Sequence, residues 1–441
     1  MSCNLNYQDN FSIPVIFYNL SSYDIHLIIT EIVNNIEGEV FLIPNNMEKY
    51  IAVIKRFEKT NIQFKFIDSF KFMNSSLEKL ASYLPNENKT ILRKHFPDQR
   101  QFDLLTQKRI FPYDYIDSWE VLEEKCLPGK EHFFNNLNES HIPEADYNRA
   151  VEVFQAFECK SIGEYSDLYL KTDVLLLSDV FENFRERLLQ SHGLDPVQYI
   201  TLPSFTWDAM LKYTGVTLEL LTDIDMVIFF QKAIRGGLSP KGGLSSKRYA
   251  EANNKYMGED YDPNKPDTYL FYGDVNNLYG WGMSEYLPEG GFKWADTNID
   301  VKQIPDDSPV GYMLEVDLHV PAEKHDYFND LPFCPEKGTP PNSKFPKLLA
   351  TLNDKKNYIL HYRNLKQALD YGLELVKIHK VIQFNQSPWL KKYIDLNTHF
   401  RKMALNGLDK NLFKLLNNAC FRKTMESQEG RRNIYLKSEW D

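Results

Sequence analysis

The chain has 441 residues, a net charge of −10, 43% hydrophobic and 25% charged residues; this composition excludes wholesale disorder, and the length predicts about two to four domains. Its five cysteines are scattered without a CxxC pair, which excludes a disulfide framework and a zinc ribbon and indicates a reducing compartment. No run approaches about 18 apolar residues and the start, MSCNLNYQDN, lacks the signal-peptide pattern, so we expect an intracellular protein, nuclear or cytoplasmic, not secreted and without membrane contact.

The charge is unevenly distributed along the chain. Residues 321–441 hold 21 Lys and Arg against 13 Asp and Glu, a net charge of +8. Residues 1–320 hold the remaining 30 Lys and Arg and 48 Asp and Glu, a net charge of −18. A basic C-terminal part fits an enzyme that binds phosphates there, and an acidic N-terminal part fits one that binds metals through carboxylates. A solvated surface of uneven sign gives the same numbers.

The predicted elements alternate at first. A β-rich run covers residues 13–20, an amphipathic helix pattern covers residues 22–35, and a second strand pattern begins at residue 40, which together predict an α/β sheet. Later elements are a helix over residues 166–189, a breaker-rich junction over residues 234–244, strands over residues 268–275 and 310–320, and a Lys-rich amphipathic helix over residues 405–424.

The strand predicted over residues 268–275 delivers Asp274 near its end and turns directly into a polar loop. A carboxylate there, together with the backbone carbonyl of Val275, can be shared by two Mg²⁺ ions. Phosphoryl transfer uses such an arrangement, because the metals neutralise a triphosphate and activate a 3′ hydroxyl. Tyr279 would then lie beneath the incoming sugar. An ordinary loop aspartate gives the same short pattern.

The extended string DVNNLYGWGMSEYLPEGGFKW closely resembles motif A of the protein-primed family B DNA polymerases found in self-synthesising transposons, adenoviruses and linear plasmids. In the family pattern Asp-x-x-Ser-Leu-Tyr-Pro, Asp274, Leu278 and Tyr279 match, while Asn277 and Gly280 replace the Ser and the Pro. The resemblance implies that Asp274 binds both Mg²⁺ or Mn²⁺ ions, that Leu278 and Tyr279 contact the nucleotide, and that Tyr279 excludes ribonucleotides.

A second group lies on the helix predicted over residues 405–424. Lys414, Asn418 and Phe421 stand at i, i+4 and i+7 and share one face. A lysine there can hold triphosphate oxygens while the ring packs on the nascent base pair; a solvated basic helix with a half-buried Phe fits as well. The residues that lie largely on the opposite side are Leu408, Leu412, Leu415 and Ala419.

The same stretch resembles motif B of the family, Lys-x-x-x-Asn-Ser-x-Tyr-Gly, which implies a catalytic and nucleotide-binding Lys414. Ala419 stands where the family has Ser, and Arg422 stands where it has Gly. An arginine there would obstruct the approach of the helix to the base pair or add a phosphate contact. Arg401 and Lys402 correspond to basic residues that assist triphosphate binding in related polymerases.

Two further patterns resemble exonuclease motifs of the same polymerases. Tyr169 and Asp173 share a helix face, where a phenol can orient water and a carboxylate can bind metal. Upstream, YNLSSYD holds Asn19, Tyr23 and Asp24, which resemble the motif whose asparagine and aromatic residue grip single-stranded DNA and whose aspartate binds metal.

Arg235, Gly236 and Gly237 resemble the Tyr-x-Gly-Gly loop that joins the exonuclease and polymerase domains and holds the template strand. Glycines there allow backbone amides to approach phosphates, and Arg235 supplies charge. The aromatic position is Ile234 in this chain. A plain hinge gives the same composition.

The resemblance spans nearly the whole chain, with its motifs in family order, and implies an α/β and α+β multidomain fold. The implied parts are a ribonuclease H-like 3′–5′ exonuclease domain over residues 1–195, a connecting region over 196–264, a palm over 265–300, an insertion with palm elements over 301–395 that contacts a terminal protein, and fingers over 396–441.

Two family motifs are not found in the sequence. No Asp-x-Glu precedes Asn19, and no Asp-Thr-Asp-like motif C follows Thr424. We therefore expect a truncated piece of a longer polymerase. Asp274 without a second palm carboxylate cannot hold two Mg²⁺ ions in the geometry that the reaction requires, so we expect this 441-residue chain to be inactive in primer extension. Asp317 is a conceivable substitute ligand, although an aspartate in that setting is more often structural.

The leading interpretation is a DNA-directed DNA polymerase that acts on primer–template DNA and dNTPs, with a terminal priming protein as a further partner. One alternative is a transposon-derived relic that binds nucleic acid without catalysis. Another is a 3′–5′ exonuclease only, which would use Asn19, Asp24, Tyr169 and Asp173.

Overall fold

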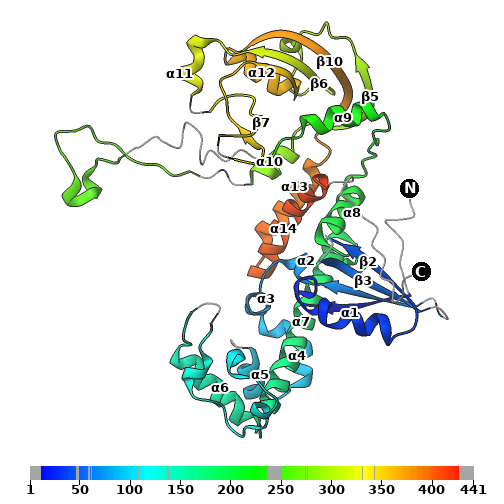
Figure 1. Cartoon of the computed structure of the whole chain (residues 1–441), viewed down its shortest axis with the longest axis vertical. Helices are drawn as coiled ribbons and strands as arrows, with labels where there is room; N and C mark the ends of the chain where they lie inside the picture. The colour runs from blue at the N-terminus through cyan, green and yellow to red at the C-terminus, as the bar shows by residue number, and fades with distance from the viewer. Residues whose placement is uncertain are drawn as a thin grey trace. The chain divides into compact units, whose positions relative to one another are not determined.

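The computed structural model describes residues 11–45, 49–57, 60, 62–106, 110–136, 139–236, 251–273, 275, 277–329, 331–341 and 343–426. The chain divides into two compact units (Figure 1): unit 1 consists of Met1–Tyr213 and Tyr393–Asp441, and unit 2 of Thr214–Lys392. Within the described ranges, no helix has the length and apolar character needed to cross a membrane. The cysteines in those ranges, Cys126, Cys159, Cys334 and Cys420, are free thiols.

Unit 1 begins with a four-stranded sheet and one helix. These elements are β1 (Ser12–Phe17), α1 (Asp24–Asn34), β2 (Glu39–Pro44), β3 (Tyr50–Arg56) and β4 (Gln63–Asp68). The strand order is β1-β4-β3-β2, with β1 parallel to β4 and the other pairs antiparallel. Helix α1 packs on the sheet through Ile25 and Ile32, which join Val53 in one apolar cluster. The helix predicted over residues 22–35 is confirmed. The strand predicted over residues 13–20 forms but ends at Phe17, because the chain turns at Asn19, which has the left-handed conformation.

The rest of unit 1 is helical. Its helices are α2 (Phe70–Met73), α3 (Leu77–Tyr83), α4 (Thr90–His95), α5 (Gln99–Thr106), α6 (Glu144–Ala156), α7 (Ile162–His192), α8 (Leu202–Thr214), α13 (Lys391–Met403) and α14 (Gly407–Thr424). Helix α7 confirms the helix predicted over residues 166–189. Ser161 accepts a hydrogen bond from the Glu164 N–H at its start, and Gly193 takes the left-handed conformation, φ 65°, at its end. Both ends are therefore defined by local sequence.

Asp179, in the middle of α7, ties α4 to this helix. Its carboxylate is buried and accepts the backbone N–H groups of Ile91 at 2.7 Å and Leu92 at 2.9 Å. These donors belong to the first turn of α4, where N–H groups have no partner within the helix. Burial raises the pKa of the Asp179 carboxyl, and the two N–H groups oppose that rise. Helix α7 thus acts as a scaffold for its neighbours.

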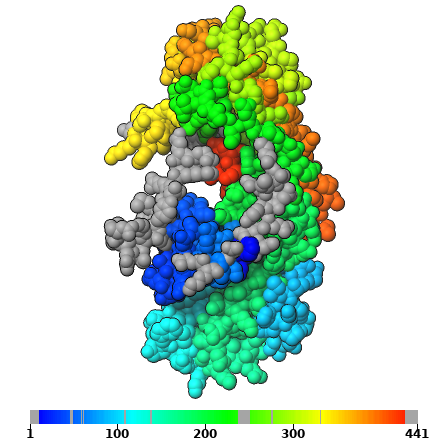
Figure 2. Space-filling view, turned by 90° about the vertical axis from the view of Figure 1, so that its right-hand side faces the viewer, coloured from blue at the N-terminus to red at the C-terminus, as the bar shows by residue number. Residues whose placement is uncertain are grey.

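Unit 2 is built on an antiparallel sheet in the order β5-β10-β6-β9. Its elements are α9 (Ile224–Ala233), α10 (Leu278–Met283), β5 (Leu287–Ala295), β6 (Val310–His319), α11 (His325–Phe328), β7 (Glu336–Gly338), β8 (Lys347–Leu349), β9 (Lys355–His361), α12 (Tyr362–Asp370) and β10 (Glu374–Ser387). Strand β6 confirms the strand predicted over residues 310–320. Figure 2 shows the yellow-green and orange parts of this unit packed as one body, although they are distant in sequence.

Both faces of the unit 2 sheet are covered. Neighbouring residues on β10 show this, because Val381 and Ile382 are both fully buried but belong to different apolar clusters. Alternate side chains of a strand point to opposite faces. Helix α12 packs with the Val381 cluster through Leu365, and α9 packs with the Ile382 cluster through Met226 and Phe229.

The strand predicted over residues 268–275 is not formed in the described part of that segment. Thr268 makes an isolated bridge with Asn253, and residues 269–273 have no regular structure. Phe271 is 94% exposed and Tyr272 is 95% exposed. The prediction was wrong because aromatic, β-prone residues form a strand only where a second strand and a packing surface complete it.

Candidate nucleotide and nucleic-acid site

Helix α14 presents the predicted motif B face to solvent. Asn406 begins the helix by accepting the Asp409 N–H at 2.8 Å. Lys414 is exposed, and Asn418 and Phe421 are half-buried. The buried side of the helix consists of Leu408, Asp409, Leu412, Phe413, Leu416, Asn417, Ala419 and Cys420. Leu415 is only half-buried, because the helical period places Leu416 rather than Leu415 in line with Leu412.

Exposed cations lie on both helices of this part of unit 1. Arg401 and Lys402 are exposed in the last turn of α13, where positive charge is favourable, and Arg422 is exposed in the last turn of α14. The rings of Phe400 and Phe413 stack between the two helices, with centroids 5.0 Å apart. The pair therefore carries its basic residues outward from a shared apolar contact, which suits a polyanionic ligand.

A buried polar chain holds α13 and α14 against the end of α7. His192 Nε2 lies 3.1 Å from Asn397 Oδ1, and the Asn397 amide donates to Asn417 Oδ1 at 3.0 Å. Asn397 is fully buried and Asn417 nearly so. Burial lowers the pKa of His192 to about 4, so the ring is neutral at pH 7. Arg187 of α7 also pairs with the buried Asp409 of α14 at 2.5 Å.

The motif A segment is described on one side of its aspartate. Asp274 lies outside the described residues, and Val275 is exposed. Asn277 takes the left-handed conformation, φ 59° and ψ 42°, immediately before α10. Tyr279 on that helix is 57% exposed, as is Leu278. The structure thus places the predicted sugar-contacting tyrosine on an outward-facing helix.

The two departures from the family's motif A pattern are physically linked. The side chain of Asn277 folds over Gly280, and a Cβ added at Gly280 would collide with it. A side chain at residue 280 would therefore require the Asn277 side chain to move.

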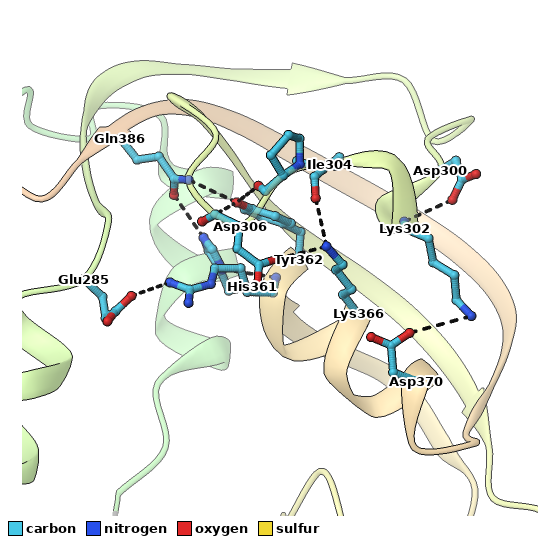
Figure 3. A network of polar contacts seen from close by, with 12 residues as sticks. Glu285, Asp300, Lys302, Ile304, Asp306, His361, Tyr362, Lys366, Asp370 and Gln386 are labelled. Carbon is cyan, nitrogen blue, oxygen red and sulfur yellow. Dashed lines mark hydrogen bonds and ion pairs between the residues drawn. The ribbon is translucent and has the colours of Figure 1, made fainter.

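A polar network secures the end of α10 to the sheet (Figure 3). Glu285, two residues past the helix, pairs with Arg363 at 2.6 Å, and each side chain is about one-third exposed. His361 accepts the Arg363 N–H and lies 3.1 Å from Gln386. Burial lowers the pKa of His361 to about 4. Gln386 reaches the Tyr362 hydroxyl at 3.4 Å, so the network is anchored in the unit 2 core.

A groove of about 650 Å³ opens beside this network, lined by Trp281 of α10 and by the polar face of α12. Its charges are mutually compensated. Lys366 pairs with Asp306 at 3.0 Å, and Lys302 pairs with Asp370 at 3.9 Å (Figure 3). The groove is lined by Glu285, Asp306 and Asp370 as well as by Arg363 and Lys366, so it lacks the excess of positive charge that attracts a polyanion.

Three of the five exonuclease-like residues lie at one edge of the unit 1 sheet. Strands β1 and β4 are parallel, so their carboxyl ends meet there. Asn19 follows β1 in the left-handed conformation, φ 61°, and Tyr23 is 66% exposed beside Asp24, the first residue of α1. The structure therefore brings the three predicted residues to one place.

Asp68, which the sequence did not suggest, completes this edge. Its buried carboxylate accepts the backbone N–H and the hydroxyl of Ser21 and the N–H of Phe70. Burial, followed by the charge of Asp68, raises the pKa of Asp24. The available signal was FKFIDS, a strand that ends in an aspartate, which is the same pattern that identified Asp274.

Tyr169 and Asp173 lie one turn apart on α7, as predicted. The Tyr169 hydroxyl accepts a hydrogen bond from Tyr113 at 2.9 Å, and its ring centroid lies 5.0 Å from that of Phe111. Among the residues that the structure describes, no three His, Cys, Asp or Glu side chains gather as metal ligands would. The described carboxylates, Asp24 and Asp173 included, therefore do not fit a complete two-metal centre.

Arg235 is engaged within unit 2. Its Nη1 donates to the backbone carbonyls of Ile359 at 2.8 Å and Ala233 at 3.0 Å, and its guanidinium lies 3.9 Å from the ring centroid of Tyr358. Gly236 is exposed, and Gly237 lies outside the described residues.

Asp317 has a structural setting on β6. It accepts the Asn357 N–H at 2.8 Å and lies 3.0 Å from His379 Nε2. The Asn357 N–H, followed by His379 and Lys356, holds the pKa of this carboxyl below its usual value.

The sequence model of DNA polymerase type B, organellar and viral, matches residues 8–421. The chain belongs to this family. No curated protein sequence matches it. Family membership confirms the resemblance seen in motifs A and B.

Solved structures of the Phi29 DNA polymerase share the fold of the chain. The ternary complex with primer-template DNA and incoming nucleotide substrates matches with a TM-score of 0.51 at 15% identity, over 93% of this chain and 59% of that chain. The orthorhombic crystal form matches with a TM-score of 0.50 at 15% identity, over 94% of this chain and 60% of that chain. The binary complex with primer-template DNA matches with a TM-score of 0.51 at 15% identity, over 94% of this chain and 59% of that chain. The chain therefore spans 59% to 60% of the length of these relatives, and its mixed α/β fold resembles theirs.

Proposed function

We propose that the chain is part of a DNA-directed DNA polymerase that transfers nucleotides from dNTPs to a primer under the direction of a template. Membership of the type B family supports this function. The observation that carries it is one face of helix α14, on which Lys414 is exposed and Asn418 and Phe421 are half-buried, while the opposite side of the helix is buried. An ammonium, an amide and a ring on one face can contact a triphosphate and a base pair together.

We propose the division of the chain implied by its motifs. Residues 1–195 form a ribonuclease H-like exonuclease domain, residues 265–300 belong to the palm, and residues 396–441 form the fingers. The connecting region covers residues 196–264, and the insertion covers residues 301–395. The parallel strands β1 and β4 with Asn19 at their edge support the first assignment.

Three partners follow from this proposal. They are primer–template DNA, dNTPs and a terminal protein that primes replication. Two of the Phi29 structures hold primer-template DNA, and one of these two also holds incoming nucleotide substrates. A protein-primed mode rests on the resemblance to that group, and an intracellular location remains a prediction.

Divalent metal ions are used by DNA polymerases of this family. The predicted Mg²⁺ or Mn²⁺ ligand Asp274 lies outside the described residues, so we assign no step of the reaction to a metal. Inactivity of the 441-residue polypeptide in primer extension remains a prediction. Mg²⁺-dependent nucleotide addition by this polypeptide that is lost in Asp274→Ala would contradict it.

The role of Lys414 is tested by dNTP binding. Lys414→Gln removes the ammonium from the proposed triphosphate contact and should weaken dNTP binding about tenfold to a hundredfold, as expected for one charge-assisted hydrogen bond. Lys410→Gln is the matched control, since Lys410 is exposed on the same helix one turn earlier. Isothermal titration of the DNA-bound protein measures both. Equal weakening in the two variants, or none in Lys414→Gln, would contradict the proposed contact.

The nuclease-only alternative draws support from the edge that holds Asn19, Tyr23 and Asp24. The family model over residues 8–421 is that of a DNA polymerase, so the polymerase function is the better supported. If the chain is a relic that binds nucleic acid without catalysis, no dNTP should change its affinity for DNA. The polymerase proposal predicts the opposite, so this measurement distinguishes the two.

A further inference from the structure

We propose that Arg235 is a positioning residue, which clamps the segment after α9 onto strand β9 and so supports template binding without contacting a DNA phosphate. This inference rests on the proposed function, because it concerns the loop expected to hold the template strand. It replaces the role that the sequence suggested for this side chain, a free positive charge facing the DNA backbone.

The guanidinium is committed on two sides. One nitrogen, Nη1, donates to the carbonyls of Ala233 and Ile359 at 3.0 and 2.8 Å. One face of its plane lies over the ring of Tyr358 at 3.9 Å, a geometry favourable for a cation and an aromatic ring. Tyr358 is 8% exposed, and its hydroxyl donates to the Pro335 carbonyl at 3.1 Å, so the platform beneath Arg235 is fixed.

The two carbonyls belong to different elements. Ala233 is the last residue of α9, where a helix leaves carbonyls without internal partners and where positive charge is favourable. Ile359 lies on β9, an edge strand that pairs with β6 on one side. Arg235 therefore joins the end of a helix to the edge of a sheet. An arginine that waits in solvent for a DNA phosphate would make no such connection.

The neighbours of Arg235 do not provide such an anchor through their side chains. Ile234 is 51% exposed, and a Cβ added at Gly236 would meet no atom within 4 Å. Helix α9 itself is held by Met226 and Phe229 in the cluster that includes Ile359. Past the end of that helix, the Arg235 side chain continues the attachment to β9.

Lysine and glutamine separate the two roles of this residue. Arg235→Lys keeps the positive charge, so a phosphate contact would survive it largely unchanged. Lysine can still donate to carbonyls, but it lacks the planar guanidinium face that stacks on the Tyr358 ring. A clamp that depends on this stacking would therefore be lost in Arg235→Lys as well as in Arg235→Gln.

The experiment measures binding of a fluorescent primer–template duplex to the 441-residue chain by anisotropy, between about 50 and 200 mM salt. We expect Arg235→Lys and Arg235→Gln to weaken binding by the same factor, about tenfold, with an unchanged salt slope. Tyr358→Leu should match them, and Tyr358→Phe, which keeps the ring but loses the hydroxyl bond to Pro335, should weaken binding clearly less than Tyr358→Leu. Lys232→Gln, at an exposed position in the last turn of α9, controls for loss of one nearby charge.

The opposite pattern would overturn the clamp. If Arg235→Lys binds normally while Arg235→Gln lowers the salt slope by about 0.9, the side chain contacts a phosphate. Hydrogen exchange supplies a readout without DNA: the Ile234 amide, which donates to the Gln231 carbonyl at 3.3 Å, should exchange at least about tenfold faster in Arg235→Lys and Tyr358→Leu, with β6 protection showing that the sheet is intact. Unchanged exchange would refute the clamp, whereas a failure of the unmodified chain to bind DNA would refute the proposed function instead.

Discussion

His192→Phe should flatten the pH dependence of unit 1 stability. The imidazole is surrounded by the rings of Phe205, Tyr393 and Phe400, with centroids 5.7 to 6.3 Å away, so a phenyl ring fits the same space. Asn397 Oδ1 can only accept, so His192 Nε2 carries the proton of the neutral ring. A second proton would place a charge in a buried site.

The magnitude follows from the pKa of His192, which burial lowers from 6.5 to about 4. Between these values the unfolded chain binds more protons than the folded chain, so stability falls as the pH falls. The stability that the neutral His192 ring contributes is fully present above about pH 6.5 and is lost progressively as the pH falls toward 4. The total loss is about 3 kcal/mol, since one pKa unit corresponds to about 1.36 kcal/mol.

Hydrogen exchange of the α13 and α14 amides, corrected for intrinsic exchange rates, measures this loss of stability between pH 7 and pH 4. His192→Phe should cost about 1 to 3 kcal/mol at pH 7, because Asn397 loses its donor, and should show a shallower decline toward pH 4. His361 of unit 2, whose pKa is also about 4, provides the internal comparison. In His192→Phe, the protection of the α12 amides of unit 2 should still decline toward pH 4 as it does in the unmodified protein. An unchanged slope in α13 and α14 would refute the reasoning.

Two further predictions concern unit 2. Glu285→Arg and Arg363→Glu should each lower the free energy of unfolding of unit 2 by about 1 kcal/mol, because both side chains of this ion pair are partly exposed. The double variant, which exchanges the two charges, should recover part of that loss in urea titrations. Losses that simply add in the double variant would contradict a direct ion pair. Lys355→Met should cost about 2 kcal/mol, because Lys355 is fully buried against Glu336 at 2.9 Å and Thr351 at 2.7 Å; a thermal midpoint that does not fall would contradict this.

Periodic patterns could be predicted from the sequence because the information is local. The long apolar repeat of α7 and the face of α14 that carries Lys414 both follow from helical spacing. The strand predicted over residues 268–275 failed for the complementary reason. Its residues favour a strand, but a strand also requires a partner, and partners are chosen by parts of the chain distant in sequence.

The buried polar residues could not be predicted for a related reason. Asn397 and Asn417 have the composition of a surface, and only the packing of α13 and α14 on α7 buries them. Arg235 was expected to face DNA because its sequence neighbours are glycines, whereas its contacts come from β9, more than a hundred residues later. The family motifs named Arg235 but did not specify what its side chain touches.

Template-directed nucleotide selection tests the central claim most directly. A primer–template duplex with a dideoxy-terminated primer binds without extension, so its affinity for the 441-residue chain can be measured with each dNTP in turn, on four templates that differ in the next base. The account predicts that the complementary dNTP alone tightens binding by about tenfold on every template, and that Lys414→Gln abolishes this effect. Equal affinity with all four dNTPs on all four templates would contradict the claim that this chain belongs to a working DNA polymerase.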